Sequence, residues 1–310
     1  MSVFSIDGIV PVIPTPFREG GDIDWTALPG LLNFAVGARV CGVCLPAFAS
    51  EFYKLADVER FELVNRAICN LNGRLPVIAQ VNHVSAGYVV ETAREFERDG
   101  ASAIAIAVPR MFGLPERDIL RYFDRVLEAI TVPLMIQDFN PGGVTVSTEF
   151  VKSLHRQHGH FRYLKLEEPM MSAKVQSILE ATNGGVGVVD GWGGTYMLEL
   201  MDAGICGVVP GLAVSDLLQM VWEKARAGNK ESAYELFQGV LPQIAYSLQS
   251  LEFFHHAEKA LLAARGVLSD TSVRDATLTV HDVDRRHIDF LNRRIVELAA
   301  KCIAHAKGSK

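Results

Sequence analysis

Short runs of consecutive apolar residues alternate along the chain with longer segments whose apolar residues recur every three or four positions. Eight such runs occur before residue 211, at 9–15, 42–47, 75–81, 102–108, 133–139, 163–168, 186–190 and 204–210. Each has the length of one strand, and most are continuously apolar instead of alternating with polar residues. This pattern is typical of strands that are buried on both faces, as in a parallel sheet covered by helices.

Amphipathic segments, which we predict to be helices, separate these runs at 56–71, 85–98, 115–130 and 147–155. Ser85 is a suitable N-cap for the second of them, and Gly100 follows it at a C-cap position. Alternation of strand and helix predicts parallel strands joined by right-handed crossovers. Eight such units are the number that closes a barrel, so the predicted fold is α/β, a (β/α)8 TIM barrel. The structural alternative is an open doubly wound sheet, which usually has fewer strands.

After Gly211 the pattern changes to helices alone, at 217–227, 230–249, 251–265 and 283–306. No stretch rich in proline, glycine or serine marks a linker between these helices and the barrel. We therefore predict a barrel over residues 1–227 and a C-terminal helical extension over 228–310. The extension is expected to pack on the barrel, so that the whole chain forms one structural domain.

Composition narrows the function classes. The 310 residues are 49% hydrophobic, which is enough for a large core, and the net charge of −6 argues against a nucleic-acid binder. No apolar run reaches the length of a membrane span, and the first ten residues do not resemble a signal peptide. The five cysteines are odd in number and scattered, as expected of reduced thiols. We expect a cytoplasmic protein with no nucleic-acid or membrane partner.

One lysine stands out by its position in the predicted barrel. Reactive groups in this architecture lie at the C-terminal ends of the strands, and Lys165 lies in the sixth run between two leucines. Burial makes the ammonium form of a lysine costly, and the neutral amine is the nucleophile that forms an imine with a 2-oxo acid. The period of two along a strand places Glu167 on the same face. In the alternative interpretation, Lys165 ends a strand near the surface and pairs with Glu167 or Glu168. Spacing alone leaves both interpretations open.

Two other groups of residues could indicate a ligand. Residues 191–194 (Gly-Trp-Gly-Gly) follow the seventh strand, where barrels often bind phosphate, so a phosphorylated sugar acid is one hypothesis. The glycines are also expected where the backbone approaches a substrate closely, or simply where the chain turns. His155, His158 and His160 have the spacing of metal ligands, but they precede the sixth strand and thus lie at the inert end of the barrel. We expect no metal and no organic cofactor.

Several motifs, taken in order, resemble one family. They are residues 8–17, which end in Thr-Pro-Phe, the Glu-Phe-Tyr-Lys-Leu of 51–55 and the Tyr-Leu-Lys of 163–165. Their order and spacing resemble the dihydrodipicolinate synthase/N-acetylneuraminate lyase family, whose members are barrels that form a Schiff base. The resemblance covers nearly the whole chain. It implies that Lys165 is the imine lysine, that a small 2-oxo acid is the substrate, and that the protein is a homo-oligomer, a tetramer or a dimer.

The chain departs from the family pattern at three places. The family's Gly-Thr-Thr-Gly-Glu loop is replaced by Ala-Phe-Ala-Ser-Glu at 47–51, so both central hydroxyls are lost. Backbone amides near Ala49 and Ser50 are left to bind the substrate carboxylate, with Phe48 as an apolar wall. Gln137 stands where the family has a proton-relaying tyrosine, in Gln-Asp-Phe-Asn-Pro at 137–141. Residues 110–112 (Arg-Met-Phe) replace the family's paired tyrosines.

One branch of the family fits these departures. Gln137-Asp138, the Lys-Leu-Glu of 165–167 and the Gly-Trp-Gly-Gly-Thr-Tyr of 191–196 resemble the 2-keto-3-deoxy-L-arabonate dehydratase branch. The resemblance implies a 2-keto-3-deoxy sugar acid as substrate and an oxo-acid semialdehyde as product. An iminium at C2 acidifies C3, a base removes a C3 proton, and an acid helps the C4 hydroxyl to leave.

Glu167 and Asp138 are the candidates for this base and this acid, without assignment of which does which. Gln137, Gly191 and Gly193 are expected to line the substrate site together with the loop at 48–50. An aldolase would instead deprotonate the C4 hydroxyl and release pyruvate and an aldehyde, and the sequence leaves this alternative open. A second alternative is a catalytically inert barrel that only binds a ligand. The lost hydroxyls and tyrosine prompt it, whereas the presence of Lys165 and Glu167 argues against it.

Overall fold

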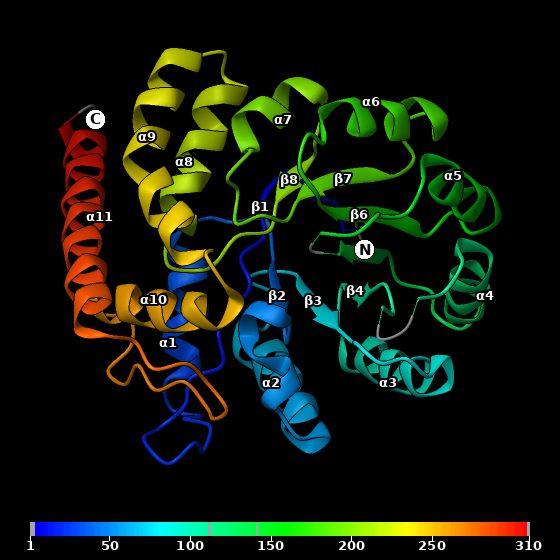
Figure 1. Ribbon diagram of the computed structural model, residues 1–310, viewed down its shortest axis with the longest axis horizontal. Helices are drawn as coiled ribbons and strands as arrows, with labels where there is room; N and C mark the ends of the chain where they lie inside the picture. The colour runs from blue at the N-terminus through cyan, green and yellow to red at the C-terminus, as the bar shows by residue number, and fades with distance from the viewer. Residues whose placement is uncertain (1–3, 111–112, 141, 309–310) are drawn as a thin grey trace.

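A computed structural model describes residues 4–110, 113–140 and 142–308 and has eight parallel strands surrounded by helices (Figure 1). The strands are β1 (Gly8–Ile9), β2 (Val43–Leu45), β3 (Val77–Gln80), β4 (Ala103–Ala107), β5 (Leu134–Phe139), β6 (Phe161–Glu167), β7 (Gly187–Asp190) and β8 (Gly207–Val208). They are hydrogen-bonded in the order β1-β8-β7-β6-β5-β4-β3-β2. The ring is closed between the first and second strands, where Ile13 N donates to Cys44 O at 3.0 Å and Cys44 N to Pro11 O at 3.0 Å. The predicted (β/α)8 barrel is confirmed.

The outer ring consists of one helix after each strand. These helices are α1 (Leu28–Gly37), α2 (Asp57–Leu71), α3 (Ala86–Asp99), α4 (Glu116–Leu127), α5 (Thr148–Gln157), α6 (Ser172–Ala181), α7 (Met197–Ala203) and α8 (Ser215–Arg226). Two short 3-10 turns, η1 (Phe48–Ser50) and η2 (Phe52–Lys54), lie between β2 and α2. The sequence pattern gave no range for α1, α6 or α7. In α1 the apolar residues are so dense that no polar face marks the helical period, and α7 spans only 7 residues.

The first strand is shorter than its apolar run. The run at 9–15 continues β1 in an extended conformation, with Val10 N bonded to Val208 O at 2.9 Å and Val12 N to Pro210 O at 2.8 Å. Proline has no amide proton and cannot donate to a neighbouring strand, so Pro11 and Pro14 interrupt the ladder. The apolar pattern therefore found the right segment, and proline shortened the strand within it.

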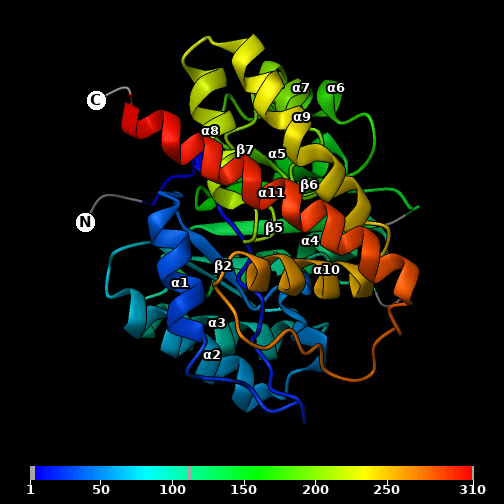
Figure 2. The ribbon, with the colours of Figure 1, turned by 90° about the vertical axis from the view of Figure 1, so that its left-hand side faces the viewer.

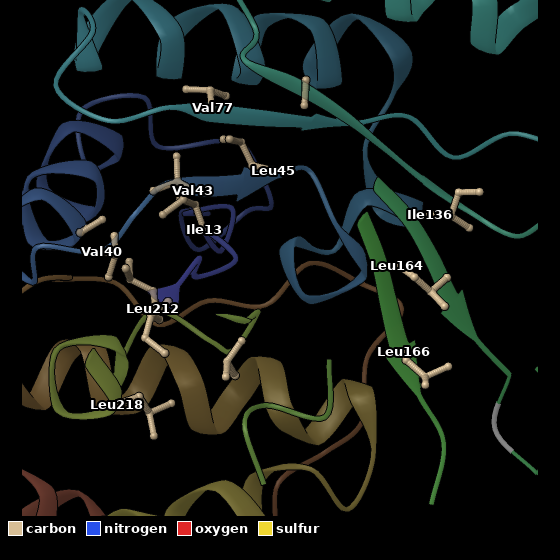
Figure 3. Packing of buried hydrophobic residues seen from close by; sticks show 14 of the residues in the cluster. Ile13, Val40, Val43, Leu45, Val77, Ile136, Leu164, Leu166, Leu212 and Leu218 are labelled. Carbon is tan, nitrogen blue, oxygen red and sulfur yellow. The ribbon is translucent and has the colours of Figure 1, made fainter. Parts of the chain in front are cut away.

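Alternate residues of each strand face the barrel interior and the surrounding helices. Figure 3 shows Ile136 on β5 and Leu164 and Leu166 on β6 among the residues that pack between barrel and helices. Met135 on β5 and Tyr163 on β6 belong instead to the cluster inside the barrel. This alternation decides which polar side chains at the strand ends reach the central cavity.

Three further helices follow the barrel: α9 (Lys230–Ser247), α10 (Leu251–Ala264) and α11 (Asp282–Gly308). Helix α9 packs against α8, α10 reaches η1 next to β2, and α11 packs on α9 and α10 (Figures 1 and 2). The division of the chain into 1–227 and 228–310 stays a prediction, and we propose it because the barrel's last helix ends at Arg226. Among the described residues, no helix has the length and apolarity needed to cross a membrane.

Candidate active site

Lys165 lies near the C-terminal end of β6, inside the barrel. Its side chain is 7% exposed, and Nζ is 3.3 Å from Oε1 of Glu167, whose side chain is also 7% exposed. Because the flanking leucines point outward to the helices, the strand presents both polar side chains to the same interior space. The predicted pair therefore forms as the period of two requires. The alternative, in which Lys165 ends near the surface, does not agree with this burial.

Glu167 sits at the end of a chain of amide hydrogen bonds. Gln80 Nε2 donates to Gln137 Oε1 at 2.6 Å, and Gln137 Nε2 donates to Glu167 Oε2 at 2.9 Å. Burial raises the pKa of Glu167 above its ordinary value, although Lys165 and the Gln137 amide act in the opposite direction. The carboxyl is thus held in one orientation and can carry a proton at higher pH than an exposed glutamate.

A cavity of about 300 Å³ opens above this pair. Lys165, Glu167 and Gln137 line it, as do the other predicted residues Phe48, Ala49, Gly191 and Gly193. The C-terminal ends of β5 and β6 and the loop after β7 contribute, which is the side on which a barrel carries its chemistry. The structure thus brings seven of the nine predicted site residues into one space.

The two predicted glycines are required by close packing around the cavity. A Cβ atom at Gly191 would lie 2.4 Å from Cγ of Glu167, so a side chain there would displace the carboxyl. Gly193 has a φ of +63°, and a Cβ there would lie 2.8 Å from Cδ1 of Leu248. Close backbone approach therefore accounts for both glycines.

Ser50 does not line the cavity, although it follows two residues that do. Its hydroxyl donates to Ile13 O at 2.6 Å and accepts from Ala47 N at 3.0 Å, and its own amide donates to Ala47 O at 2.9 Å. Ser50 therefore shapes η1 and has no free amide for a substrate. Within the described residues, the amides of Phe48 and Ala49 have no acceptor, and these two remain available.

Asp138 is the second predicted residue that the structure does not bring to the cavity. It neighbours Gln137 on β5 and therefore points to the opposite face, where it is completely buried. Its carboxylate forms an ion pair with Arg110 and accepts a hydrogen bond from the amide of Val146. Asp138 thus fastens the loop after β5 to the loop after β4. Met111, Phe112 and Pro141, which the sequence motifs included, lie outside the described residues.

Sequence reasoning missed the part of the cavity wall that comes from outside the barrel. Leu248–Leu251, which joins α9 to α10, and Phe254 of α10 line the cavity together with Trp192. Nothing in their apolar periodicity distinguishes them from ordinary core residues of a helical extension. Gln80 was missed as well, although it carried a signal: it is a polar residue at the C-terminal end of an apolar run.

The three histidines with metal-like spacing do not converge. His155 bonds Phe161 O, His158 bonds Asp124, and His160 bonds Leu127 O, so each ring has its own partner. Among the described residues, no group of three His, Cys, Asp or Glu side chains is placed to hold a metal ion.

Comparison with known proteins tests the resemblance directly. The model of the dihydrodipicolinate synthetase family matches residues 5–291. The chain belongs to this family. Members of the dihydrodipicolinate synthetase family are class I lyases, so the chain is an enzyme of the lyase class, and the resemblance inferred from motifs is confirmed.

Relatives and solved structures agree with this assignment along almost the whole chain. An L-2-keto-3-deoxyarabonate dehydratase of Azospirillum brasilense is 28% identical over 95% of this chain and 96% of its own length. A 4-hydroxy-tetrahydrodipicolinate synthase of Methanococcus vannielii is 25% identical over 76% of this chain and 81% of its own. The crystal structure of dihydrodipicolinate synthase from Rhodopseudomonas palustris has a TM-score of 0.87 at 25% identity, covering 95% of this chain and 99% of that one.

Proposed function

We propose that the protein is a Schiff-base dehydratase that removes the C4 hydroxyl from a 4-hydroxy-2-oxo acid. This class includes the 2-keto-3-deoxy sugar acids to which the name of the Azospirillum relative points. The observation that carries the proposal is the buried Lys165–Glu167 pair, 3.3 Å apart at the floor of a cavity large enough for a small acid. An amine and a carboxyl in this arrangement are the two groups that imine chemistry requires.

The reaction begins at the amine. Lys165 attacks the C2 carbonyl, a C–N bond forms, and the carbonyl oxygen takes one proton from the amine and one from the solvent and leaves as water to give an iminium. The iminium withdraws electrons from C3, so Glu167 can remove a C3 proton and leave an enamine. The enamine electrons then expel the C4 hydroxyl, which takes a proton from Glu167 and leaves as water. Addition of water to C2 finally breaks the C–N bond and frees Lys165.

Glu167 is proposed for both proton transfers because it is the only carboxyl among the described residues that line the cavity. Its raised pKa, caused by burial, suits a group that must alternately accept and donate a proton. Asp138 is proposed as a positioning residue, since its carboxylate faces Arg110 on the far side of β5. Gln137 would keep Glu167 aimed at the imine.

The substrate carboxylate is proposed to bind the free amides of Phe48 and Ala49. Both residues line the cavity, and their amide protons have no acceptor within the described part of the chain. Backbone amides bind anions without a side-chain hydroxyl, so the loss of the loop's central hydroxyls does not by itself remove carboxylate binding.

The test is borohydride trapping of the enzyme with pyruvate and with a 2-keto-3-deoxy pentonate, followed by peptide mapping. An adduct on Lys165 is expected, and it should disappear in Lys165→Ala. Lys174→Ala is the matched control, because Lys174 pairs with Glu168 but does not line the cavity. The absence of an adduct in the folded wild-type protein would overturn the proposal and favour a barrel that only binds a ligand.

Analysis of products separates dehydration from carbon–carbon bond cleavage. A dehydratase converts a 2-keto-3-deoxy acid without releasing pyruvate, whereas a retro-aldol enzyme releases pyruvate and an aldehyde in equal amounts. If pyruvate is released from such a substrate, the reaction is retro-aldol cleavage and not dehydration, and the proposed role of Lys165 is unchanged.

We also propose that the protein is a cytoplasmic homo-oligomer, either a tetramer or a dimer. The apolar side chains of Phe290, Val296 and Ile303 are exposed on α11 and support contact with a second copy. Sedimentation equilibrium of the wild-type protein would test this, and a monomer at micromolar concentration would contradict it.

A further inference from the structure

The cavity has a polar floor and a largely apolar wall. Lys165, Glu167 and Gln137 form the floor, where the C2 imine and the C3 proton of the proposed reaction would lie. Everything in a substrate beyond C4 must therefore contact the wall. The composition of that wall determines which substituent at C4 is accepted, and this reasoning rests on the function proposed above.

Charge is the first property of the wall. Of the described residues that line the cavity, Lys165 alone has a cationic side chain, and it belongs to the floor. A phosphate or a second carboxylate at the far end of a substrate needs an arginine, a lysine or several amides nearby. The packing of Gly191 against Glu167 and of Gly193 against Leu248 already accounts for the glycines that suggested phosphate binding. The wall is thus suited to an uncharged substituent.

Apolar surface is the second property. The rings of Phe48 and Phe139 contact each other with centroids 5.5 Å apart and planes tilted by 45°. Leu248, Leu251 and Phe254 add apolar surface from the junction of α9 and α10. Burial of an alkyl or aryl group of the substrate against these side chains stabilises the complex, and the same side chains offer no hydrogen bond to a hydroxyl.

Two polar side chains of the wall have backbone partners, whereas the buried indole nitrogen of Trp192 has none within the described residues. Ser250 accepts a hydrogen bond from Phe253 N at 3.2 Å, because it is the N-cap of α10. Gln249 Nε2 donates to Tyr246 O at 3.0 Å. A substrate hydroxyl beyond C4 would thus lose its hydrogen bonds to water and find few partners on the wall. Each hydroxyl left without a partner lowers the affinity for the substrate by roughly ten-fold to a hundred-fold.

From these observations we infer that the preferred substrate is a monoanionic 4-hydroxy-2-oxo acid whose C4 substituent is uncharged and apolar, a short alkyl or an aryl group. Polyhydroxylated and phosphorylated acids of the same length are poorer substrates. The carboxylate at C1 and the reacting atoms C2 to C4 stay those of the proposed reaction.

The test compares kcat/KM for two acids that differ only at C4, one carrying an ethyl group and the other a hydroxymethyl group. The ethyl compound is expected to have the larger kcat/KM by about ten-fold or more. A smaller ratio would overturn the inference, as would turnover of a C4 phosphooxymethyl acid at the rate of the ethyl compound. Borohydride trapping with pyruvate is run in parallel: an adduct on Lys165 keeps the proposed function whatever the ratio, and its absence removes both.

Two matched variants test whether the wall sets the ratio. Leu251→Asn introduces an amide at the first turn of α10, where Leu251 lines the cavity, and should lower the ethyl-to-hydroxymethyl ratio at least five-fold. Val283→Asn makes the same kind of change in the first turn of α11, where Val283 is 63% exposed, and should leave the ratio unchanged. Equal ratios in Leu251→Asn and the wild type would count against the wall as the source of specificity.

Discussion

Two buried lysine–glutamate pairs in the described part of the chain have different surroundings. Lys165 and Glu167 are 3.3 Å apart and lie beside the cavity. Lys259 on α10 and Glu51 after η1 are 2.6 Å apart, and each side chain is 1% exposed. Both pairs would look alike to a search for buried lysines, yet their other hydrogen bonds separate them.

Lys259 and Glu51 each have further hydrogen-bond partners. Lys259 also donates to Ser272 O at 2.8 Å, while Glu51 accepts from Lys54 Nζ at 3.1 Å and from the amide of Arg274 at 3.2 Å. The pair thereby ties the loop after β2 to α10, and both segments contribute residues to the cavity lining. Among the described residues, Lys165 has only Glu167 as an ion-pair partner, and it lines the cavity.

The difference shows which buried lysine can react. Lys259 donates to two fixed acceptors and lies over the ring of Phe17, so it has no room for a carbonyl, although burial lowers its pKa. Lys165 lies beside a cavity and is paired with a single carboxyl, so the carbonyl of a substrate has room to reach its amine. Burial identifies the candidate lysines, and a cavity with room for a substrate identifies which of them is the nucleophile.

The largest effect is expected from removing the cavity lysine. Lys165→Met should lower kcat at least 10³-fold, because no imine forms. The melting temperature should change little, because burial already favours the neutral form of Glu167. Steady-state kinetics and differential scanning calorimetry measure the two effects, and activity within ten-fold of wild type would rule out Lys165 as the nucleophile.

Removing the other lysine should act on stability. Lys259→Met leaves the Glu51 carboxylate buried beside fewer cations, which should lower the free energy of unfolding by about 3–5 kcal/mol. Denaturation in urea measures this change. The double variant Lys259→Met/Glu51→Gln removes the uncompensated charge and should recover part of the loss. If the single variant were as stable as wild type, the pair would not hold the loop after β2 and α10 together.

A smaller effect is expected at Gly191. Gly191→Ala places a Cβ atom 2.4 Å from Cγ of Glu167 and should shift the carboxyl, lowering kcat by roughly 10²-fold while Lys165 still forms the pyruvate adduct. Gly37→Ala is the control, since a Cβ there meets nothing within 4 Å. Loss of the adduct in Gly191→Ala would mean that the glycine serves Lys165 instead of Glu167.

The smallest effect concerns Asp190 at the end of β7, a buried carboxyl without a lysine partner. Burial raises its pKa from 3.8 to about 7. The unfolded state therefore releases its proton first as the pH rises, so the free energy of unfolding falls between about pH 4 and pH 7. Asp190→Asn should flatten this fall when urea denaturation is measured across that range. Burial also raises the pKa of Glu258 to about 7, so part of this pH dependence of the free energy of unfolding should remain in the variant. An unchanged profile would show that Asp190 does not titrate in this range.

Much of this architecture could be predicted from the sequence because strand and helix periods are local. The same period of two that paired Lys165 with Glu167 also implied that adjacent residues face opposite ways. Gln137 and Asp138 could not both reach the cavity, and the structure places Gln137 inside it. The wall at 248–254 could not be predicted, because docking of α10 beside β2 is a long-range event that no local pattern encodes.

The floor and wall of the cavity come from different stretches of the chain, since β5 and β6 carry the polar groups of the floor and the α9–α10 junction carries much of the apolar surface. Changes in the junction can therefore alter what the enzyme accepts without touching the groups that perform the chemistry. An engineer who seeks a new substrate would randomise residues 248–254 and leave the barrel alone. Conversely, removing the C-terminal helices as a dispensable appendage would leave the cavity without one of its sides.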